Sequence, residues 1–169
     1  ICELGTKGST ALNKFQEFCF VVELDQDASF ESSNLDVMGM TEDDADGRQG
    51  LISFEYNGSD VVLLWLPESN GNATAMLEST YQLLQDSQPS NTFVPVSDGD
   101  LNVDQQQGKF GGFVVTDASG ENAGGGLVGA WNCPDPQITL SLIVTGSDAT
   151  SIQIRFDRII SGFKCSKPK

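Results

Sequence analysis

Residues 50–66, GLISFEYNGSDVVLLWL, predict the centre of the fold. The side chains of the first seven residues are expected to point alternately to the two faces of a strand. The Asn57-Gly58 pair that follows is the strongest short signal for a β-hairpin. Residues 61–66 are apolar on both faces, which is typical of a strand covered on each side. We therefore expect a hairpin whose second strand lies in the middle of a sheet.

Further strands are expected on both sides of this hairpin. Residues 18–24 are apolar and β-branched, and four strand-like segments follow in the second half of the chain, at 92–96, 109–117, 126–133 and 137–145. Turn residues separate these segments at Ser97-Asp98-Gly99, Ala118-Ser119-Gly120 and Pro134-Asp135-Pro136. The second half of the chain therefore predicts an antiparallel meander.

In two segments the apolar residues are spaced with the period of a helix. Residues 73–85 follow Asn72, a natural N-cap, and residues 148–163 start at Asp148 and end with Ser161-Gly162. The apolar stripe of the first consists of Ala73, Met76, Leu77, Thr80, Tyr81 and Leu84, and that of the second of Ile152, Phe156, Ile159, Ile160 and Phe163. The element order predicts an α+β domain, in which an antiparallel β-sheet has flanking helices.

Length and charge limit the classes of function. A chain of 169 residues predicts a single domain, 1–169, with an N-terminal extension at 1–17 and a core at 18–165. The 24 acidic and nine basic side chains give a formal net charge of -15, which excludes nucleic acid and anionic lipid surfaces as expected partners. Histidine is absent, which excludes imidazole bases, histidine triads and histidine-ligated metals. No apolar run reaches the 18 residues of a transmembrane segment.

The cysteines predict an extracytoplasmic compartment, whether secreted, periplasmic, lumenal or on the cell surface. Cys2, Cys19, Cys133 and Cys165 are even in number and too widely spaced for a CxxC motif. Of the three possible pairings, their order along the chain favours Cys2 with Cys19 and Cys133 with Cys165; four buried thiols are the alternative. The chain begins at Ile1 without methionine, as expected after removal of a signal peptide or anchor.

Two sequons mark candidate glycosylation sites at Asn57 and Asn72, within Asn57-Gly58-Ser59 and Asn72-Ala73-Thr74. A glycan on Asn72 would compete with the predicted capping bond of the same side chain.

Two acidic segments are candidate calcium sites, and no other cofactor is expected. Calcium prefers several oxygen ligands from a loop that can bend around the ion. One segment gathers Glu42, Asp43, Asp44 and Asp46 ahead of Gly47. The other has Asp98, Asp100 and Asp104, which together with Asn102 place oxygen side chains at alternate positions. Neither segment has the register of an EF-hand, and solvated acidic turns are the alternative interpretation of both.

Residues 156–164, FDRIISGFK, resemble the closing helix of the PsbP-like family. The resemblance implies a PsbP-like α/β/α sandwich in an extracytoplasmic compartment. Such a domain is usually without catalysis and docks onto a larger assembly or is tethered at a membrane. Plant and cyanobacterial members stabilise the manganese and calcium centre of photosystem II. This chain has no histidine and adds four cysteines, so we carry over the fold and not the photosystem role.

The expected function is that of a non-enzymatic, secreted or surface-tethered accessory domain that docks onto a protein partner in a larger assembly. The acidic charge favours a basic partner and salt-sensitive association. One alternative is a calcium-, small-ligand- or carbohydrate-binding domain, with Trp65, Trp131 or Tyr56 in an open groove. A hydrolase that uses carboxylates is another, and adaptation to high salt would explain the acidity without any binding role.

Overall fold

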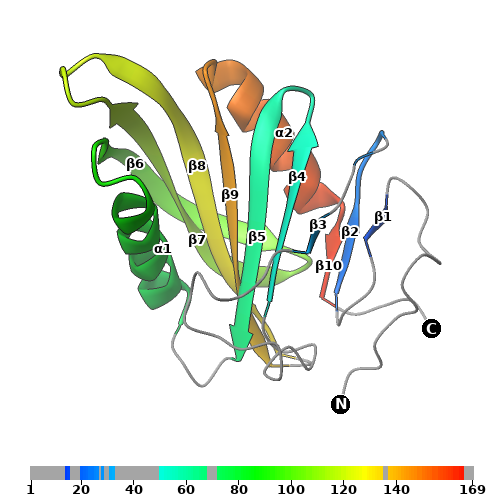
Figure 1. Ribbon diagram of the computed structural model, residues 1–169. Helices are drawn as coiled ribbons and strands as arrows, with labels where there is room; N and C mark the ends of the chain where they lie inside the picture. The colour runs from blue at the N-terminus through cyan, green and yellow to red at the C-terminus, as the bar shows by residue number, and fades with distance from the viewer. Residues whose placement is uncertain are drawn as a thin grey trace.

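The computed structural model describes residues 14–15, 20–26, 28, 31–32, 50–67, 72–134 and 137–165. These residues form two helices and ten strands, shown in Figure 1. The elements in chain order are β1 (Lys14–Phe15), β2 (Val21–Glu23), β3 (Glu31–Ser32), β4 (Gly50–Tyr56), β5 (Ser59–Pro67), α1 (Ala73–Ser87), β6 (Thr92–Val103), β7 (Gln106–Thr116), β8 (Asn122–Cys133), β9 (Ile138–Gly146), α2 (Ala149–Ser161) and β10 (Phe163–Lys164).

A seven-stranded antiparallel sheet forms the middle layer, in the order β3-β4-β5-β9-β8-β7-β6. Helix α1 packs on one face against β7, β8 and β9, and α2 packs on the other face against β8 and β9 (Figure 1). A small sheet of β1, β2 and β10 lies beside α2. The predicted α+β class, an antiparallel sheet with flanking helices, is confirmed. Strand β1 begins at Lys14, inside the segment predicted as an extension.

The predicted hairpin is formed by β4 and β5, which pair from Gly50 opposite Trp65 to Tyr56 opposite Ser59. Asn57 and Gly58 at its tip have φ of 51° and 84°, values that asparagine and glycine tolerate best. Strand β5 lies between β4 and β9 and is covered on both faces, which explains its continuous apolar sequence. Leu63 and Trp65 contribute to the core on the α2 side, and Leu64 to the core on the α1 side.

The meander of β6 to β9 is confirmed, but the predicted turn at Ser97-Asp98-Gly99 is wrong. Strand β6 continues through these residues, and its pairing with β7 shifts register at a bulge between Pro95 and Ser97. The chain instead turns at Asp104 and Gln105, with φ of 47° and 69°. Gly99 has a different role, because a Cβ there would lie 2.6 Å from the ring of Phe110 on β7.

Both helices begin at the predicted caps. The Asn72 side chain accepts a hydrogen bond from the Ala75 N–H at 2.9 Å, and Asp148 accepts one from the Ser151 N–H at 2.9 Å. Helix α2 ends two residues before the predicted Phe163, because Gly162 turns the chain into β10. A Cβ at Gly162 would lie 1.9 Å from the carbonyl oxygen of Glu23.

The predicted disulfide between Cys133 and Cys165 is present, and it ties the end of β8 to the residue after β10. It lies beside an aromatic cluster, in which Trp131 contacts Phe163 with ring centroids 5.0 Å apart. The predicted partner pair, Cys2 and Cys19, lies outside the described residues.

Candidate functional site

The second predicted calcium segment does not form a loop. Asp98 and Asp100 lie on β6 and Asp104 lies in the turn that follows. Asp100 pairs with Lys109, while Asp104 accepts the Cys165 N–H at 2.8 Å and lies 3.6 Å from the Lys164 Nζ. The described part of the chain contains no group of three His, Cys, Asp or Glu side chains that could hold a metal ion. Of the first segment, Glu42, Asp43, Asp44 and Asp46 lie outside the described residues, so calcium binding there stays a prediction.

The aromatic residues considered for an open groove are core residues. Trp65, Trp131 and Tyr56 each have 0% of their surface exposed. The Tyr56 hydroxyl donates a hydrogen bond to Asp25, and burial raises the pKa of this phenol, with a further increase from that hydrogen bond. A carbohydrate groove built on these three rings is therefore wrong.

Of the two sequons, Asn57 is exposed at the tip of the β4–β5 hairpin, whereas Asn72 is exposed but uses its side-chain oxygen to cap α1. Glycosylation of either residue stays a prediction.

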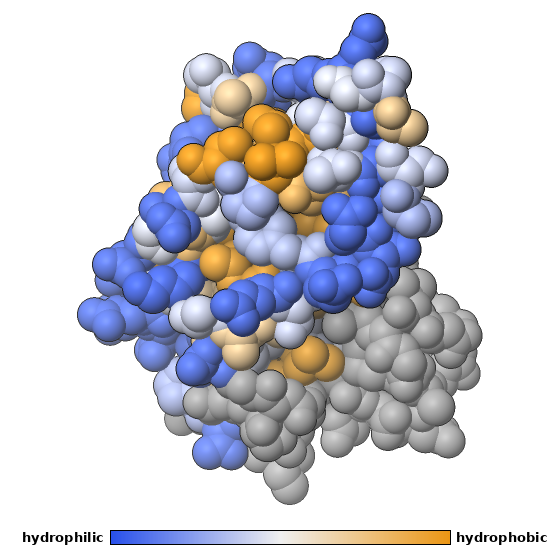
Figure 2. Space-filling model, turned by 90° about the vertical axis from the view of Figure 1, so that its left-hand side faces the viewer, coloured by the Kyte–Doolittle hydropathy of each residue, from blue (hydrophilic) through white to orange (hydrophobic). Residues whose placement is uncertain are grey.

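Strand β6 ends the seven-stranded sheet and is largely open to solvent. It is 12 residues long, and most of its side chains are exposed. Val94 and Val96 have 39% and 60% of their surface exposed, which is uncommon for large apolar residues at a sheet edge. Figure 2 faces this side of the molecule and shows apolar side chains gathered in its upper part among hydrophilic ones.

The backbone of β6 leaves hydrogen-bonding groups unpaired along this edge. In a two-residue hairpin the closing pair is hydrogen bonded, here Val103 with Gln106, and bonded and non-bonded pairs then alternate along the strands. The N–H and C=O groups of Asp98, Asp100 and Asn102 consequently point away from β7. No other strand that the structure describes lies on that side.

An apolar hollow of about 300 Å³ lies beside β6 on the α2 side of the sheet. Its walls include Val96, Val114, Leu127 and Ile152. Strand β8 contributes Gly124, Gly125 and Gly126, which have no side chains to fill the space.

A second hollow, of about 440 Å³, lies on the opposite side of β6, against α1. It is lined by Glu78 and Tyr81 of α1 and by Asp98 of β6. The Tyr81 hydroxyl fits there because Gly111 has no side chain, and it is buried without a hydrogen-bond partner among the described residues. Burial raises the pKa of the Tyr81 phenol, and the Asp98 carboxylate raises it further.

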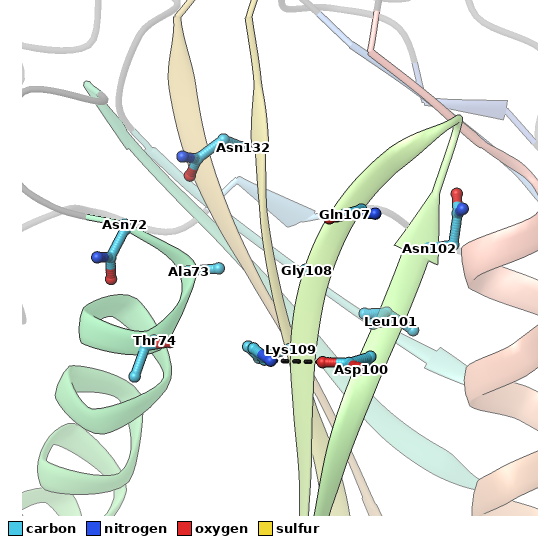
Figure 3. A pocket seen from close by; sticks show the side chains of 10 residues that line it. All are labelled: Asn72, Ala73, Thr74, Asp100, Leu101, Asn102, Gln107, Gly108, Lys109 and Asn132. Atoms are coloured by element: carbon cyan, nitrogen blue, oxygen red, sulfur yellow. Dashed lines mark hydrogen bonds and ion pairs between the residues drawn. The ribbon is translucent and has the colours of Figure 1, made fainter.

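A third hollow, of about 700 Å³, continues along the α1 side of β6 to the start of α1. Figure 3 shows its polar lining, with Asn72 at the N-cap of α1, Asn132 on β8, and Lys109 on β7 joined to Asp100 on β6. The hydrogen bond from Lys109 lowers the pKa of the Asp100 carboxyl.

The charges around β6 are almost all negative. Residues 72–121 carry the single cation Lys109, and their carboxylates are Glu78, Asp86, Asp98, Asp100, Asp104, Asp117 and Glu121. The other described cations lie on β1, α2 and β10, and are Lys14, Arg155, Arg158 and Lys164. The part of the described chain that contains β6 is therefore its more acidic part.

Together these features form one surface, which we call the β6 edge: the unpaired groups at Asp98, Asp100 and Asn102, the exposed Val94 and Val96, and the hollows on either side of the strand. The sequence alone does not reveal this surface. The available signal is the period-two spacing of Asp98, Asp100 and Asn102, which also fits alternating calcium ligands.

Comparison with known proteins supports the fold. No known protein family matches the sequence, and no curated protein matches it significantly. Among solved structures, the chain is similar to cyanobacterial PsbP (CyanoP) from Synechocystis sp. PCC 6803, with a TM-score of 0.57. The similarity covers 95% of this chain and 96% of that one, at 9% sequence identity. The chain therefore has a PsbP-like fold. None of the described helices is long and apolar enough to cross a membrane.

Proposed function

We propose that this protein is a non-enzymatic, extracytoplasmic accessory domain that docks onto a protein partner through the β6 edge. The observation that carries the proposal is a long sheet edge with unpaired backbone groups, two exposed valines and apolar and polar hollows on its two sides. Surfaces that combine a solvent-exposed apolar patch with a polar rim mark protein interaction sites.

The PsbP-like fold and the Cys133–Cys165 disulfide support the extracytoplasmic part of the proposal. The acidic surroundings of β6 favour a basic partner, because opposite potentials speed the encounter of two proteins and select against like-charged ones. Attachment at the cell surface and membership of a larger assembly are part of the same proposal.

Site-specific photo-cross-linking in the source cells tests the docking surface. A photoreactive residue at position 96 is compared with one at Ile154, which is 48% exposed on α2 and serves as the matched control. We expect a discrete adduct from position 96, identified by mass spectrometry, and none from position 154. Less of this adduct should form when an extract of the cells is irradiated at high salt.

Equal labelling from both positions, or no adduct from position 96, would overturn docking through the β6 edge. Turnover in a broad hydrolase screen that is lost in a carboxylate variant would overturn the non-enzymatic assignment.

A further inference from the structure

We propose that the β6 edge binds an extended segment of the partner as an added β-strand, in which lysine or arginine side chains occupy alternate positions. This inference rests on the proposed docking function and specifies which part of a partner binds and how. Strand addition to an open sheet edge derives its affinity from backbone hydrogen bonds and its specificity from the alternate side chains.

The C-terminal half of β6 pairs regularly with β7. From Ser97 opposite Gly112 to Val103 opposite Gln106, the register with β7 is unbroken. Asp98, Asp100 and Asn102 then offer three N–H donors and three C=O acceptors to an added strand. The bulge between Pro95 and Ser97 limits the ladder at its other end, because proline has no N–H and a bulge interrupts pairing.

The two sides of β6 differ in the side chains that they present. Side chains alternate along a strand, so those of Asp98, Asp100 and Asn102 share the α1 side, while Leu101 and Val103 share the α2 side. Asp98 forms no ion pair with the described residues, whereas Asp100 pairs with Lys109, the single cation of residues 72–121. Two carboxylates against one cation leave a net negative charge on this side of β6, where alternate basic residues of an added strand are favourable.

The remaining residues of the added strand would lie on the α2 side. Near the bulge they would reach the apolar hollow, which is lined by Val96, Ser97 and Leu127. Apolar or β-branched side chains fit this position, because the hollow holds about 300 Å³ and its walls include Val96, Leu127 and Ile152. The segment that the edge fits therefore alternates basic and apolar residues.

The same charges argue against a second copy of this chain as the occupant. Two β6 edges would bring Asp98 and Asp100 of one copy beside those of another, and like charges directly opposite one another destabilise strand pairing.

Amide hydrogen exchange by NMR with two synthetic peptides tests the proposal on the whole, isotope-labelled chain. The peptide TKVKVKT alternates its lysines, whereas TKKKVVT has the same composition and charge without the alternation. We expect TKVKVKT to slow exchange at the amides of Asp98, Asp100 and Asn102, with an affinity that falls as salt is added. We expect TKKKVVT to leave these amides unprotected.

Variants test the charge pairing separately. Asp98→Asn keeps the size of the side chain and is expected to weaken binding of TKVKVKT by roughly two- to fivefold, the range of a cross-strand charge pair. Glu55→Gln, at an exposed position of β4 toward the opposite edge of the sheet, is the control and should leave the affinity unchanged. Equal effects of the two substitutions would show that binding of the peptide depends only on the net charge of the protein. That result would overturn the proposed charge pairing at Asp98.

Other outcomes are also decisive. Equal protection by both peptides, or no protection by either, would overturn strand addition. Protection that appears without peptide and grows with protein concentration would show a second copy at the edge and would also overturn it. If strand addition fails while the cross-link from position 96 is found, the docking function stands without this mode of binding.

Discussion

At the scale of single residues, the two buried tyrosine hydroxyls differ in their partners. Tyr56 donates a hydrogen bond to Asp25, whereas the Tyr81 hydroxyl has no partner among the described residues. We expect Tyr56→Phe to lower the free energy of unfolding by about 1 kcal/mol, because it removes a hydrogen bond and leaves its acceptor. Tyr81→Phe should be neutral or stabilising. Urea denaturation of both variants measures the difference, and an equal loss in both would contradict it.

The two tyrosines also predict how stability responds to alkaline pH. Burial raises the pKa of both phenols, so the folded protein keeps their protons to higher pH than the unfolded chain does. The contribution of the two phenols to the free energy of unfolding should then be fully present below about pH 10, the ordinary tyrosine pKa. It should be lost as the pH rises beyond that value. Melting temperatures measured across this range should fall less in Tyr81→Phe than in the original protein. A parallel decline in both would show that Tyr81 does not contribute.

At the scale of elements, the N-cap of α1 makes a prediction of its own. Asn72→Ala removes the acceptor of the Ala75 N–H and should lower the free energy of unfolding by about 1 kcal/mol. Thr74→Ala is the matched control, because it breaks the same sequon and leaves the cap in place. Chemical denaturation of protein made in a host without glycosylation separates the two roles. A similar loss in both variants would argue against the cap.

The elements set by local sequence were predictable, and those set by distant pairing were not. Asn57-Gly58 and the caps Asn72 and Asp148 act through their own neighbours, so the hairpin and both helix starts are where the sequence predicts them. The continuation of β6 through Gly99 depends instead on pairing with β7, which overrides the turn preference of glycine. The alternating spacing of Asp98 and Asp100 is accordingly that of one face of a strand.

The end of α2 is also set by a distant part of the chain and was not predictable from the local sequence. The apolar spacing continues to Phe163, but the close approach of Gly162 to Glu23 on β2 stops the helix and starts β10. Nothing in residues 156–164 alone indicates that β2 lies there. The resemblance of this segment to a PsbP-like closing helix nevertheless indicated the fold of the whole chain, which the similarity to cyanobacterial PsbP supports.

At the scale of the whole molecule, the net charge of -15 predicts a response to salt. Repulsion among the carboxylates destabilises the compact state, and salt screens it as the Debye length shortens from roughly 30 Å at 0.01 M to roughly 3 Å at 1 M. We expect the melting temperature to rise over this range. A fall would mean that exposed ion pairs such as Arg158 with Asp25, 3.0 Å apart, contribute more than the repulsion costs.

The Cys133–Cys165 disulfide makes the remaining prediction, because it closes a segment with a sequence separation of 32 that contains β9 and α2. Replacing both cysteines by alanine should lower the free energy of unfolding by about 3–4 kcal/mol, mainly through the greater freedom of the unfolded chain. Denaturation of the variant, with the original protein as reference, measures the loss. A change below about 1 kcal/mol would contradict a structural role for the bridge.

The same bridge decides how the domain would carry mechanical tension. A pull on the chain beyond Cys165 passes through the sulfur atoms into the end of β8, which is paired with β7 and β9 inside the sheet. Helix α2 and β9 lie within the closed segment and bear none of this load directly. Rupture would then require β8 to shear from both neighbours at once, whereas in the reduced protein the same pull would peel β10 and α2 away first.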